Sequence, residues 1–196
     1  MPPMQRPLKA IRSTASISGA VLALGIALAG CGSGSAAKTT ARIQISSSAI
    51  EGTTLPAHFT CDGANVNPPI KWSGVPSGTK ELALFAVGKP PAGSANASST
   101  IEWALAGINP SLGEVKAGKK PAGAFLEEAS DGKRHYSICP PKGQTRLYAF
   151  ALYALPEHVT VTAQISGVAL YHNLAEGKPE FRAPAAGAIT ASYTRK

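Results

Sequence analysis

Apolar residues along this chain come in short runs, and segments rich in proline and glycine separate these runs. Residues 81–87, 100–108 and 146–155 are nearly continuous apolar runs of strand length, which is typical of buried strands. In other segments apolar and polar residues alternate, which indicates strands with one buried face. The strands predicted in this way cover residues 41–49, 70–75, 81–87, 100–108, 146–155, 158–165 and 188–194.

One segment, residues 166–176, has the period of a helix and contains no proline. Its apolar side chains recur at helical spacing, at Val168, Leu170, Tyr171 and Leu174. Strands therefore dominate the pattern, and the sequence predicts a mainly β fold, antiparallel, with one late helix. No internal repeat and no second domain are visible, so we expect residues 42–196 to form a single domain.

The N-terminus has a different pattern, in which three basic residues precede an uncharged apolar run at 17–29. The run is short for a membrane-spanning helix and ends in small residues, which is typical of an export signal. The sequence LAGC at its end, with Cys31 last, resembles the lipobox of bacterial lipoproteins, in which the cysteine is acylated. We therefore expect a lipoprotein signal peptide at 1–30 and a small, polar, flexible tether at 31–41.

An ordinary secretory signal peptide or a membrane anchor are the alternatives for this N-terminal segment. A lipid on Cys31 places the exported protein on the bacterial cell membrane, either at the outer face of the cytoplasmic membrane or on the outer membrane. Because a single acyl chain binds a membrane only marginally, stable anchoring requires several chains on that residue.

The net charge of the chain is mildly basic and says little about its partner. The chain carries a formal charge of +8, and three of its nineteen basic residues but none of its eleven acidic residues lie in 1–30, which leaves +5 after cleavage. No run of lysine and arginine is long enough to indicate a nucleic-acid surface, so nucleic acid is excluded as a partner. Mild positive charge is adequate for solubility and for attraction to anionic lipid headgroups.

Two cysteines, Cys61 and Cys139, remain once Cys31 is assigned to the lipid. An exported chain folds in an oxidising compartment, which favours a disulfide between them. Two separate buried thiols are the alternative, because the sequence does not show whether the side chains are close. No pair of histidines at ligand spacing accompanies the cysteines, so we predict no metal site and no other cofactor.

Each of these two cysteines lies in a segment that also contains a diproline. Residues 60–76 combine Cys61 with asparagines, prolines and a tryptophan, and residues 135–150 combine Cys139 with Pro140, Pro141 and a following apolar run. Proline fixes the backbone angle φ, so such segments can hold a pocket in shape before a ligand binds. We expect the two segments to meet at one end of a sheet and to form the rigid wall of a pocket.

The residues of these two segments follow two family signatures. The first is carried by Thr60, Cys61, Asp62, Gly63, Asn65, Asn67, Pro68, Pro69, Ile70 and Trp72. The second, partly eroded, is carried by Ser137, Ile138, Cys139, Pro140, Pro141, Gly143, Arg146, Leu147, Tyr148 and Phe150. Together they resemble the phosphatidylethanolamine-binding protein family, in its bacterial Raf-kinase-inhibitor-like branch. The resemblance runs from about Arg42 to Arg195 and implies a β-sandwich-like domain with a small pocket for phosphate-like headgroups.

The polar residues of that pocket are replaced in this sequence. Where the family has an acidic, proline-containing loop, residues 87–92 read VGKPPA, without a carboxylate. Glu102 and Arg146 stand at the two positions where the family has histidines. If the resemblance holds, the two side chains face each other. In one alternative, the two side chains pair with each other and plug the pocket. In the other, they bind a ligand, with Arg146 contacting its anionic group and Glu102 contacting its amine.

The sequence contains no arrangement typical of a hydrolase. Neither a Gly-x-Ser-x-Gly elbow nor a Ser-His-Asp arrangement is visible, and both family histidines are absent. Asp62 precedes a glycine, so it is either a turn residue or a ligand group. The candidate ligand-binding residues are Asp62, Glu102, Trp103, Tyr136, Pro140 and Arg146.

We therefore expect a membrane-anchored, non-enzymatic binding protein with a chemically altered pocket. Its partner is a small polar molecule, a lipid headgroup or a protein surface. The alternative is a protein-interaction or inhibitor module whose pocket is plugged by a pair between Glu102 and Arg146. An open pocket favours the first hypothesis, and a filled pocket favours the second.

Overall fold

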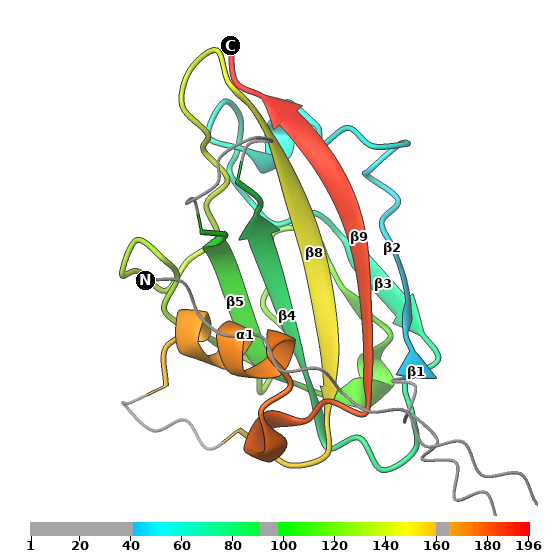
Figure 1. Ribbon diagram of the computed structural model, residues 1–196. Helices are drawn as coiled ribbons and strands as arrows, with labels where there is room; N and C mark the ends of the chain where they lie inside the picture. The colour runs from blue at the N-terminus through cyan, green and yellow to red at the C-terminus, as the bar shows by residue number, and fades with distance from the viewer. Residues whose placement is uncertain (1–40, 91–97, 160–164) are drawn as a thin grey trace, which may run out of the picture. The chain divides into compact units, whose positions relative to one another are not determined.

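The computed structural model describes residues 41–90, 98–159 and 165–196, and their strands form two sheets (Figure 1). The larger sheet has six strands in the order β1 (Ala41–Arg42), β9 (Ala185–Thr194), β8 (Thr145–Leu155), β4 (Glu81–Gly88), β5 (Thr100–Ile108) and β7 (Phe125–Leu126). The smaller sheet has three strands in the order β2 (Gln44–Ser46), β3 (Ile70–Ser73) and β6 (Glu114–Val115). Three short 3-10 turns lie at Ala57–Phe59, Pro110–Leu112 and Pro179–Phe181.

The continuous apolar runs form the centre of the large sheet, as the sequence predicts. Every residue of β4 is buried, and its neighbours β8 and β5 are buried over most of their length. Strand β4 pairs antiparallel with β5 on one side and with β8 on the other, and β9 pairs antiparallel with β8 over ten residues. Strands covered on both faces need no polar alternation, which explains why their sequences read as unbroken apolar stretches.

Side chains from the two sheets pack together into one core. Trp72 and Val115 enter it from the small sheet, and Leu84, Trp103 and Phe150 enter it from the large sheet. Sheets packed face to face in this way form a sandwich. The predicted mainly β, sandwich-like fold is therefore confirmed.

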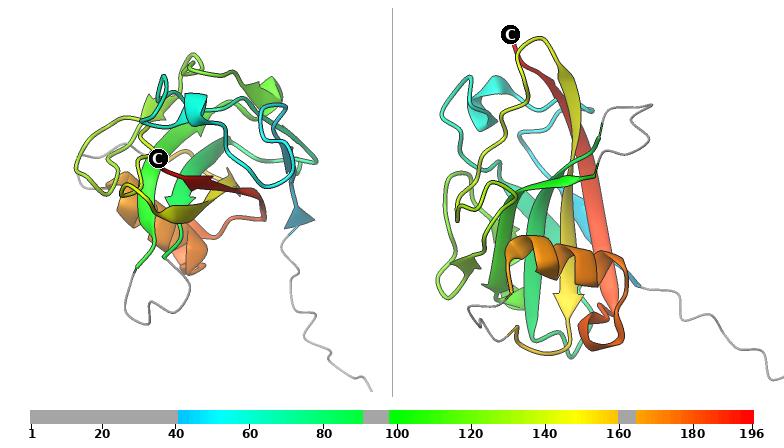
Figure 2. Two further views of the ribbon diagram at one scale, coloured as in Figure 1. Left: turned by 90° about the horizontal axis from the view of Figure 1, so that it is seen from above. Right: turned by 60° about the vertical axis from the view of Figure 1, so that its left-hand side comes forward.

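A second core lies on the opposite face of the large sheet, under the helix α1 (Gly167–Ala175). Leu170 and Leu174 of this helix are buried against β4 and β5, and Figure 2 shows the helix lying across the sheet. The side chain of Ser166 caps the helix by accepting a hydrogen bond from the Ala169 N–H at 3.1 Å. The predicted late helix is confirmed, with its apolar face on the sheet.

The structure differs from the sequence-based expectation in details that local patterns do not encode. The short β1 pairs in parallel with β9, so the large sheet is mixed rather than purely antiparallel. The two-residue strands β6 and β7 were not predicted, because two residues are too few to show a period. Of the predicted strand 158–165, residues 160–164 lie outside the described part of the chain, and the remaining residues are not in a strand.

The N-terminal predictions also lie outside the described residues: the signal peptide at 1–30, Cys31, and all of the tether except its last residue. Within the residues that the structure describes, no helix is long and apolar enough to cross a membrane.

Candidate functional site

A disulfide joins the two cysteine-proline segments. The sulfur atoms of Cys61 and Cys139 are 2.07 Å apart, and the N–H of Cys61 donates a hydrogen bond to the Ile138 carbonyl at 3.0 Å. The predicted disulfide is therefore present, and the two segments lie side by side at one end of the large sheet.

Further hydrogen bonds connect the same two segments. The Tyr136 hydroxyl donates to the Phe59 carbonyl at 2.8 Å. The side-chain amide of Asn65 donates to the Ser137 hydroxyl at 3.4 Å and accepts from the Ile138 N–H at 3.3 Å. The segments therefore form one continuous wall, as expected from their prolines.

Glu102 and Arg146 meet beside this wall. A guanidinium nitrogen of Arg146 lies 3.6 Å from Oε1 of Glu102, and the two side chains are 25% and 21% exposed, respectively. The Thr100 hydroxyl donates to the same Glu102 oxygen at 2.7 Å and accepts from Arg146 at 3.4 Å. The predicted juxtaposition is confirmed, but the contact is a single long one rather than a bidentate pair.

A β-bulge turns Glu102 toward the core between the sheets. The partners of Ala86 and Val87 across the strand pair are Trp103 and Ile101, so Glu102 is the extra residue of the bulge. The bulge lets Glu102 and Trp103, which are adjacent in sequence, lie on the same side of β5.

Gly88 provides the space for the Glu102 carboxylate. It lies in register between Thr100 on β5 and Tyr148 on β8. A Cβ atom at Gly88 would lie 2.7 Å from the Thr100 hydroxyl and 2.8 Å from Oε1 of Glu102. The carboxylate therefore rests directly over the backbone of β4.

Tyr148 forms the buried end of this site. Its side chain is 0% exposed, and its hydroxyl has no hydrogen-bond partner among the described residues. Burial raises the pKa of Tyr148, the nearby Glu102 raises it further, and Arg146 acts in the opposite direction. A buried hydroxyl without a partner is costly, so the hydrogen-bonding capacity at this end of the site is unused.

The pKa of Glu102 is also raised. Burial is the main cause, and it is opposed by the hydrogen bond from Thr100 and by the charge of Arg146. The site thus contains a carboxylate that takes up a proton more readily than an exposed glutamate, next to a permanent cation.

Trp103 and Tyr136 lie together next to Glu102. Their rings pack edge to face with centroids 5.6 Å apart. Burial raises the pKa of Tyr136, and the proximity of Tyr148 and Glu102 raises it further. The N–H of Ser137, the next residue, donates to the Glu102 carbonyl at 3.0 Å, which connects the wall to β5.

Asp62 and Pro140 are hydrogen-bonded to the end of the chain, through Tyr193 and Arg195, and we call these four residues the clasp. Asp62 accepts hydrogen bonds from the Tyr193 hydroxyl at 2.5 Å and from Nε of Arg195 at 3.3 Å. Arg195 also donates to the Pro140 carbonyl at 3.3 Å. The Tyr193 hydrogen bond is the main cause of a lowered pKa of Asp62. Since Tyr193 is the cross-strand neighbour of Arg146, the clasp borders the site.

The structure adds three residues that the motifs do not single out as ligand contacts: Gly88, Thr100 and Tyr148. The last two lie two positions from Glu102 and Arg146 on the same strands. Because side chains two positions apart on a strand share a face, this spacing is the sequence signal that could have identified them. Gly88 has no comparable signal, because its role depends on which strands flank β4.

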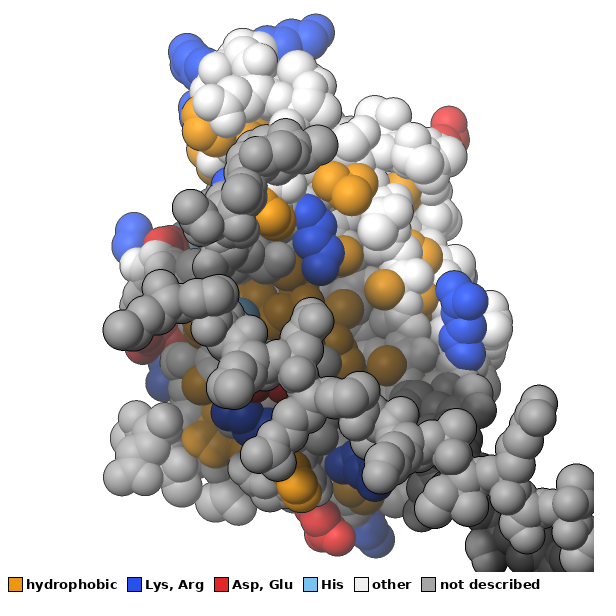
Figure 3. Space-filling view, in the orientation of Figure 1, with side chains coloured by type: hydrophobic (Ala, Val, Ile, Leu, Met, Phe, Trp, Pro, Cys, Tyr) orange, Lys and Arg blue, Asp and Glu red, His pale blue; other side chains and the backbone are white. Residues whose placement is uncertain are grey.

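Other kinds of site find little support in the described part of the chain. There, no group of three or more His, Cys, Asp or Glu side chains is placed to hold a metal ion. On the coloured part of the face in Figure 3, Lys and Arg side chains are scattered rather than gathered into one patch.

Comparison with known proteins agrees with this architecture. A family model described as phosphatidylethanolamine-binding protein matches residues 45–192. LppC of Mycobacterium tuberculosis, a candidate lipoprotein by its name, is 32% identical over 188 residues, which cover 84% of this chain and 89% of LppC.

Two crystal structures have similar folds. Escherichia coli YbcL, described as a member of the mammalian PEBP family, has a TM-score of 0.66 and 27% identity, covering 80% of this chain and 100% of YbcL. CT736 from Chlamydia trachomatis has a TM-score of 0.66 and 22% identity, covering 81% of this chain and 100% of CT736.

Proposed function

Because the chain belongs to the phosphatidylethanolamine-binding protein family, we propose that it is an exported, lipid-anchored binding protein whose ligand contacts Glu102, Arg146 and Tyr148. No reaction is assigned to it. The family name identifies a headgroup that carries a phosphate and an amine. A ligand of this kind needs a cation and an anion placed side by side, which is the arrangement of Arg146 and Glu102.

The observation that carries this proposal is the unused hydrogen-bonding capacity at the site. Arg146 has five N–H donors. Among the described residues, its only ion pair is the long one to Glu102 and its only side-chain hydrogen bond is the long one to Thr100. The Tyr148 hydroxyl has no partner in that part of the chain. A zwitterionic ligand replaces the weak pair between Glu102 and Arg146 by two charge-assisted contacts, one to each side chain. Once that pair opens, the ligand can also bond to the buried Tyr148 hydroxyl.

The contact between Glu102 and Arg146 also bears on the alternative, a protein-interaction module with a plugged pocket. A pair that closes a pocket permanently is expected to be short and bidentate, because only such geometry offsets the loss of hydration. The distance of 3.6 Å and the partial exposure of both side chains favour a site that opens to a ligand.

Isothermal titration calorimetry with glycerophosphoethanolamine tests the proposal. Its phosphodiester and ammonium groups correspond to a phosphatidylethanolamine headgroup without the acyl chains. We expect binding to the exported domain, and we expect Arg146→Gln and Glu102→Gln each to weaken it by about tenfold or more, since each removes a charged hydrogen-bond partner.

Matched controls are available far from the site. Arg182 is exposed after the last 3-10 turn, and Glu114 lies on the small sheet, so Arg182→Gln and Glu114→Gln should bind as the unmodified protein does. Absence of binding to glycerophosphoethanolamine by a folded protein, or equal binding by Arg146→Gln, contradicts the headgroup site and supports the interaction module.

The export and anchoring part of the proposal has separate support. The LAGC sequence ends at Cys31 behind an apolar run, and LppC, which is similar over most of its length, is named as a candidate lipoprotein. Mass spectrometry of the mature protein from a bacterial membrane should show an N-terminal Cys31 that carries acyl chains. An unmodified N-terminus, or a chain that retains residues 1–30, contradicts this part alone.

A further inference from the structure

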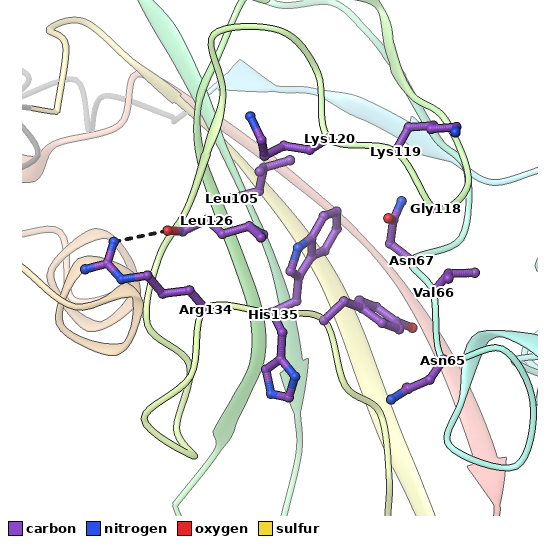
Figure 4. Close-up of a pocket in the computed structure, with 12 residues that line it drawn as sticks. Asn65, Val66, Asn67, Leu105, Gly118, Lys119, Lys120, Leu126, Arg134 and His135 are labelled. Carbon is purple, nitrogen blue, oxygen red and sulfur yellow. Dashed lines mark hydrogen bonds between the residues drawn. The ribbon is translucent and has the colours of Figure 1, made fainter.

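A second candidate site is a cavity that Trp103 and Tyr136 help to line. Its volume is about 260 Å³, and neither Glu102, Arg146 nor Tyr148 lines it (Figure 4). Tyr136 and Trp103 belong to its lining and also lie next to Glu102. The cavity and the Glu102 side chain therefore share these two residues as neighbours.

The interior of this cavity is apolar. Trp103, Leu105 and Leu126 line it from the large sheet, together with Val66 and Tyr136 from the cysteine-proline wall. Trp103 and Leu105 are almost fully buried in the core between the sheets, at 2% and 0% exposed. The interior is therefore rigid and suits a flat apolar group.

The polar asparagines in the lining are already used by the protein. The side-chain amide of Asn67 donates to the Pro68 and Lys116 carbonyls, both at 3.1 Å. The backbone carbonyl of Asn67 accepts from the Gly118 N–H at 3.0 Å. Asn65 bonds to Ser137 and Ile138. These contacts fix the loop that carries the lysines. The side-chain oxygen of Asn67 accepts no hydrogen bond from the described residues, but an oxygen acceptor does not bind an anion.

Only basic side chains remain at the rim. Figure 4 shows Lys119 and Lys120 on one side of the cavity and Arg134 and His135 on the other. Of these, Arg134 lies 3.7 Å from Glu127 and His135 lies 2.6 Å from Asp131. Lys120 donates to the Ala124 carbonyl, which does not neutralise it. Lys119 has no ion pair within the described residues, and no acidic residue lines the cavity.

We propose that this cavity is a second ligand site, distinct from the headgroup site, and that it binds a small organic anion with a single flat apolar ring, such as an aromatic carboxylate. We expect an anion because Lys119 and Lys120 line the cavity and neither has an ion pair among the described residues. The volume selects the size, because 260 Å³ is slightly below the lower limit for drug-sized ligands, about 300 Å³. The ring packs on Trp103 and Tyr136, and the carboxylate reaches Lys119.

Phenylacetate is a suitable probe, and NMR spectroscopy a suitable measurement. The chain has two tryptophans, and Trp72 does not line the cavity, so its indole N–H signal is an internal reference for that of Trp103. We expect phenylacetate to shift the Trp103 signal with a dissociation constant on the order of 1 mM, as for other ligands of about ten heavy atoms. Acetate, which lacks the ring, and phenethylamine, which has the opposite charge, should leave the signal unchanged.

Variants separate this site from the headgroup site. Lys119→Gln should weaken phenylacetate binding about fivefold, the effect of one partly exposed charge pair. Lys178→Gln, a matched change beyond the helix, should have no effect. Arg146→Gln should leave phenylacetate binding intact while it weakens headgroup binding by about tenfold or more.

Three results overturn the inference. The first is a Trp103 signal that responds to phenethylamine as strongly as to phenylacetate. The second is a phenylacetate titration that Lys119→Gln leaves unchanged. Loss of phenylacetate binding in Arg146→Gln assigns the probe to the headgroup site instead, and likewise contradicts a second site.

Discussion

At the scale of single residues, the site depends on one acidic side chain placed by a bulge and one glycine that leaves room for it. Glu102 is held over Gly88 by the Thr100 hydroxyl, and Arg146 approaches it from β8. Burial raises the pKa of the carboxyl group and the two polar neighbours lower it, so its charge depends on a balance between them. This balance gives ligand binding a specific dependence on pH.

Headgroup binding should weaken as the pH falls, and the loss should begin above the ordinary glutamate pKa of 4.5. The ammonium of glycerophosphoethanolamine needs the ionised form of Glu102, and that form is lost as the pH falls through the raised pKa. The phosphodiester keeps its charge over this range. The same shift has the opposite sign for folding: its contribution to stability is present below pH 4.5 and is lost as the pH rises through the folded-state pKa.

Calorimetric titrations from pH 7.5 to pH 4.5 check this dependence. In Glu102→Gln, the remaining weak binding should not change with pH over the same range. An affinity of the unmodified protein that stays constant down to pH 4.5 contradicts an ionised Glu102 as the partner of the amine.

Gly88→Ala should impair binding more than folding. The added Cβ meets the ends of two side chains, those of Thr100 and Glu102, which can rotate away. We therefore expect a change in the free energy of unfolding within about 1 kcal/mol, but a loss of headgroup affinity of about tenfold because the carboxylate is displaced. Calorimetry and urea denaturation measure the two effects.

Gly187→Ala provides the contrast, since a Cβ there meets the backbone carbonyl of Ile43, which cannot rotate away. That variant should lose stability rather than affinity. Equal affinity of Gly88→Ala and the unmodified protein indicates that the position of the carboxylate does not matter for binding.

At the scale of elements, the site depends on two loops that the disulfide and several hydrogen bonds hold together. The crosslink closes a loop with a sequence separation of 78, and hydrogen bonds from Tyr136 and Asn65 run beside it. The clasp of Asp62, Tyr193 and Arg195 attaches this pair of loops to the end of β9. Each loop is therefore positioned by the other and by a strand.

Removing the disulfide with the double variant Cys61→Ala and Cys139→Ala should lower the free energy of unfolding by about 2–4 kcal/mol, because the unfolded chain loses a long closed loop. The fold should persist, since the hydrogen bonds between the loops remain. Urea denaturation of the oxidised protein and of the double variant measures the difference. Tyr193→Phe, which cuts the clasp but not the crosslink, should cost less, about 1 kcal/mol.

Much of this element-scale arrangement could be predicted from the sequence. The apolar runs identify β4, β5 and β8, and the period of α1 identifies its buried face, because buried positions are occupied by apolar residues at a spacing that can be read from the sequence. The meeting of Glu102 with Arg146 was predicted from the two positions at which the family has histidines. The bulge at Glu102, the parallel β1 and the role of Gly88 could not be predicted, because each depends on the register between strands distant in sequence. The cavity beside Trp103 and Tyr136 was not predicted, because the loop that carries Lys119 matches no motif.

At the scale of the whole molecule, the headgroup site and the start of the described chain lie at opposite ends of β9. Ala41 pairs with Ala185 at its beginning, and Arg146 pairs with Tyr193 near its end. Eight residue steps along a strand span about 26 Å. The proposed tether of 31–41 has an expected root-mean-square length of about 18 Å as a flexible chain. The distance from Ala41 to the site therefore exceeds the expected length of the tether.

We predict that the ligand arrives from solution and is not a lipid of the host membrane. The anchored protein and a soluble Cys31→Ser variant should then bind glycerophosphoethanolamine with dissociation constants within about twofold of each other, because the anchor lies outside the binding reaction. Cell fractionation should find Cys31→Ser outside the membrane fraction, since the acyl chains supply the attachment. Vesicles of phosphatidylethanolamine are the competitor that distinguishes the two sources. If they displace glycerophosphoethanolamine from the anchored protein as effectively as the free headgroup does, the site binds lipid in a bilayer and this prediction is wrong.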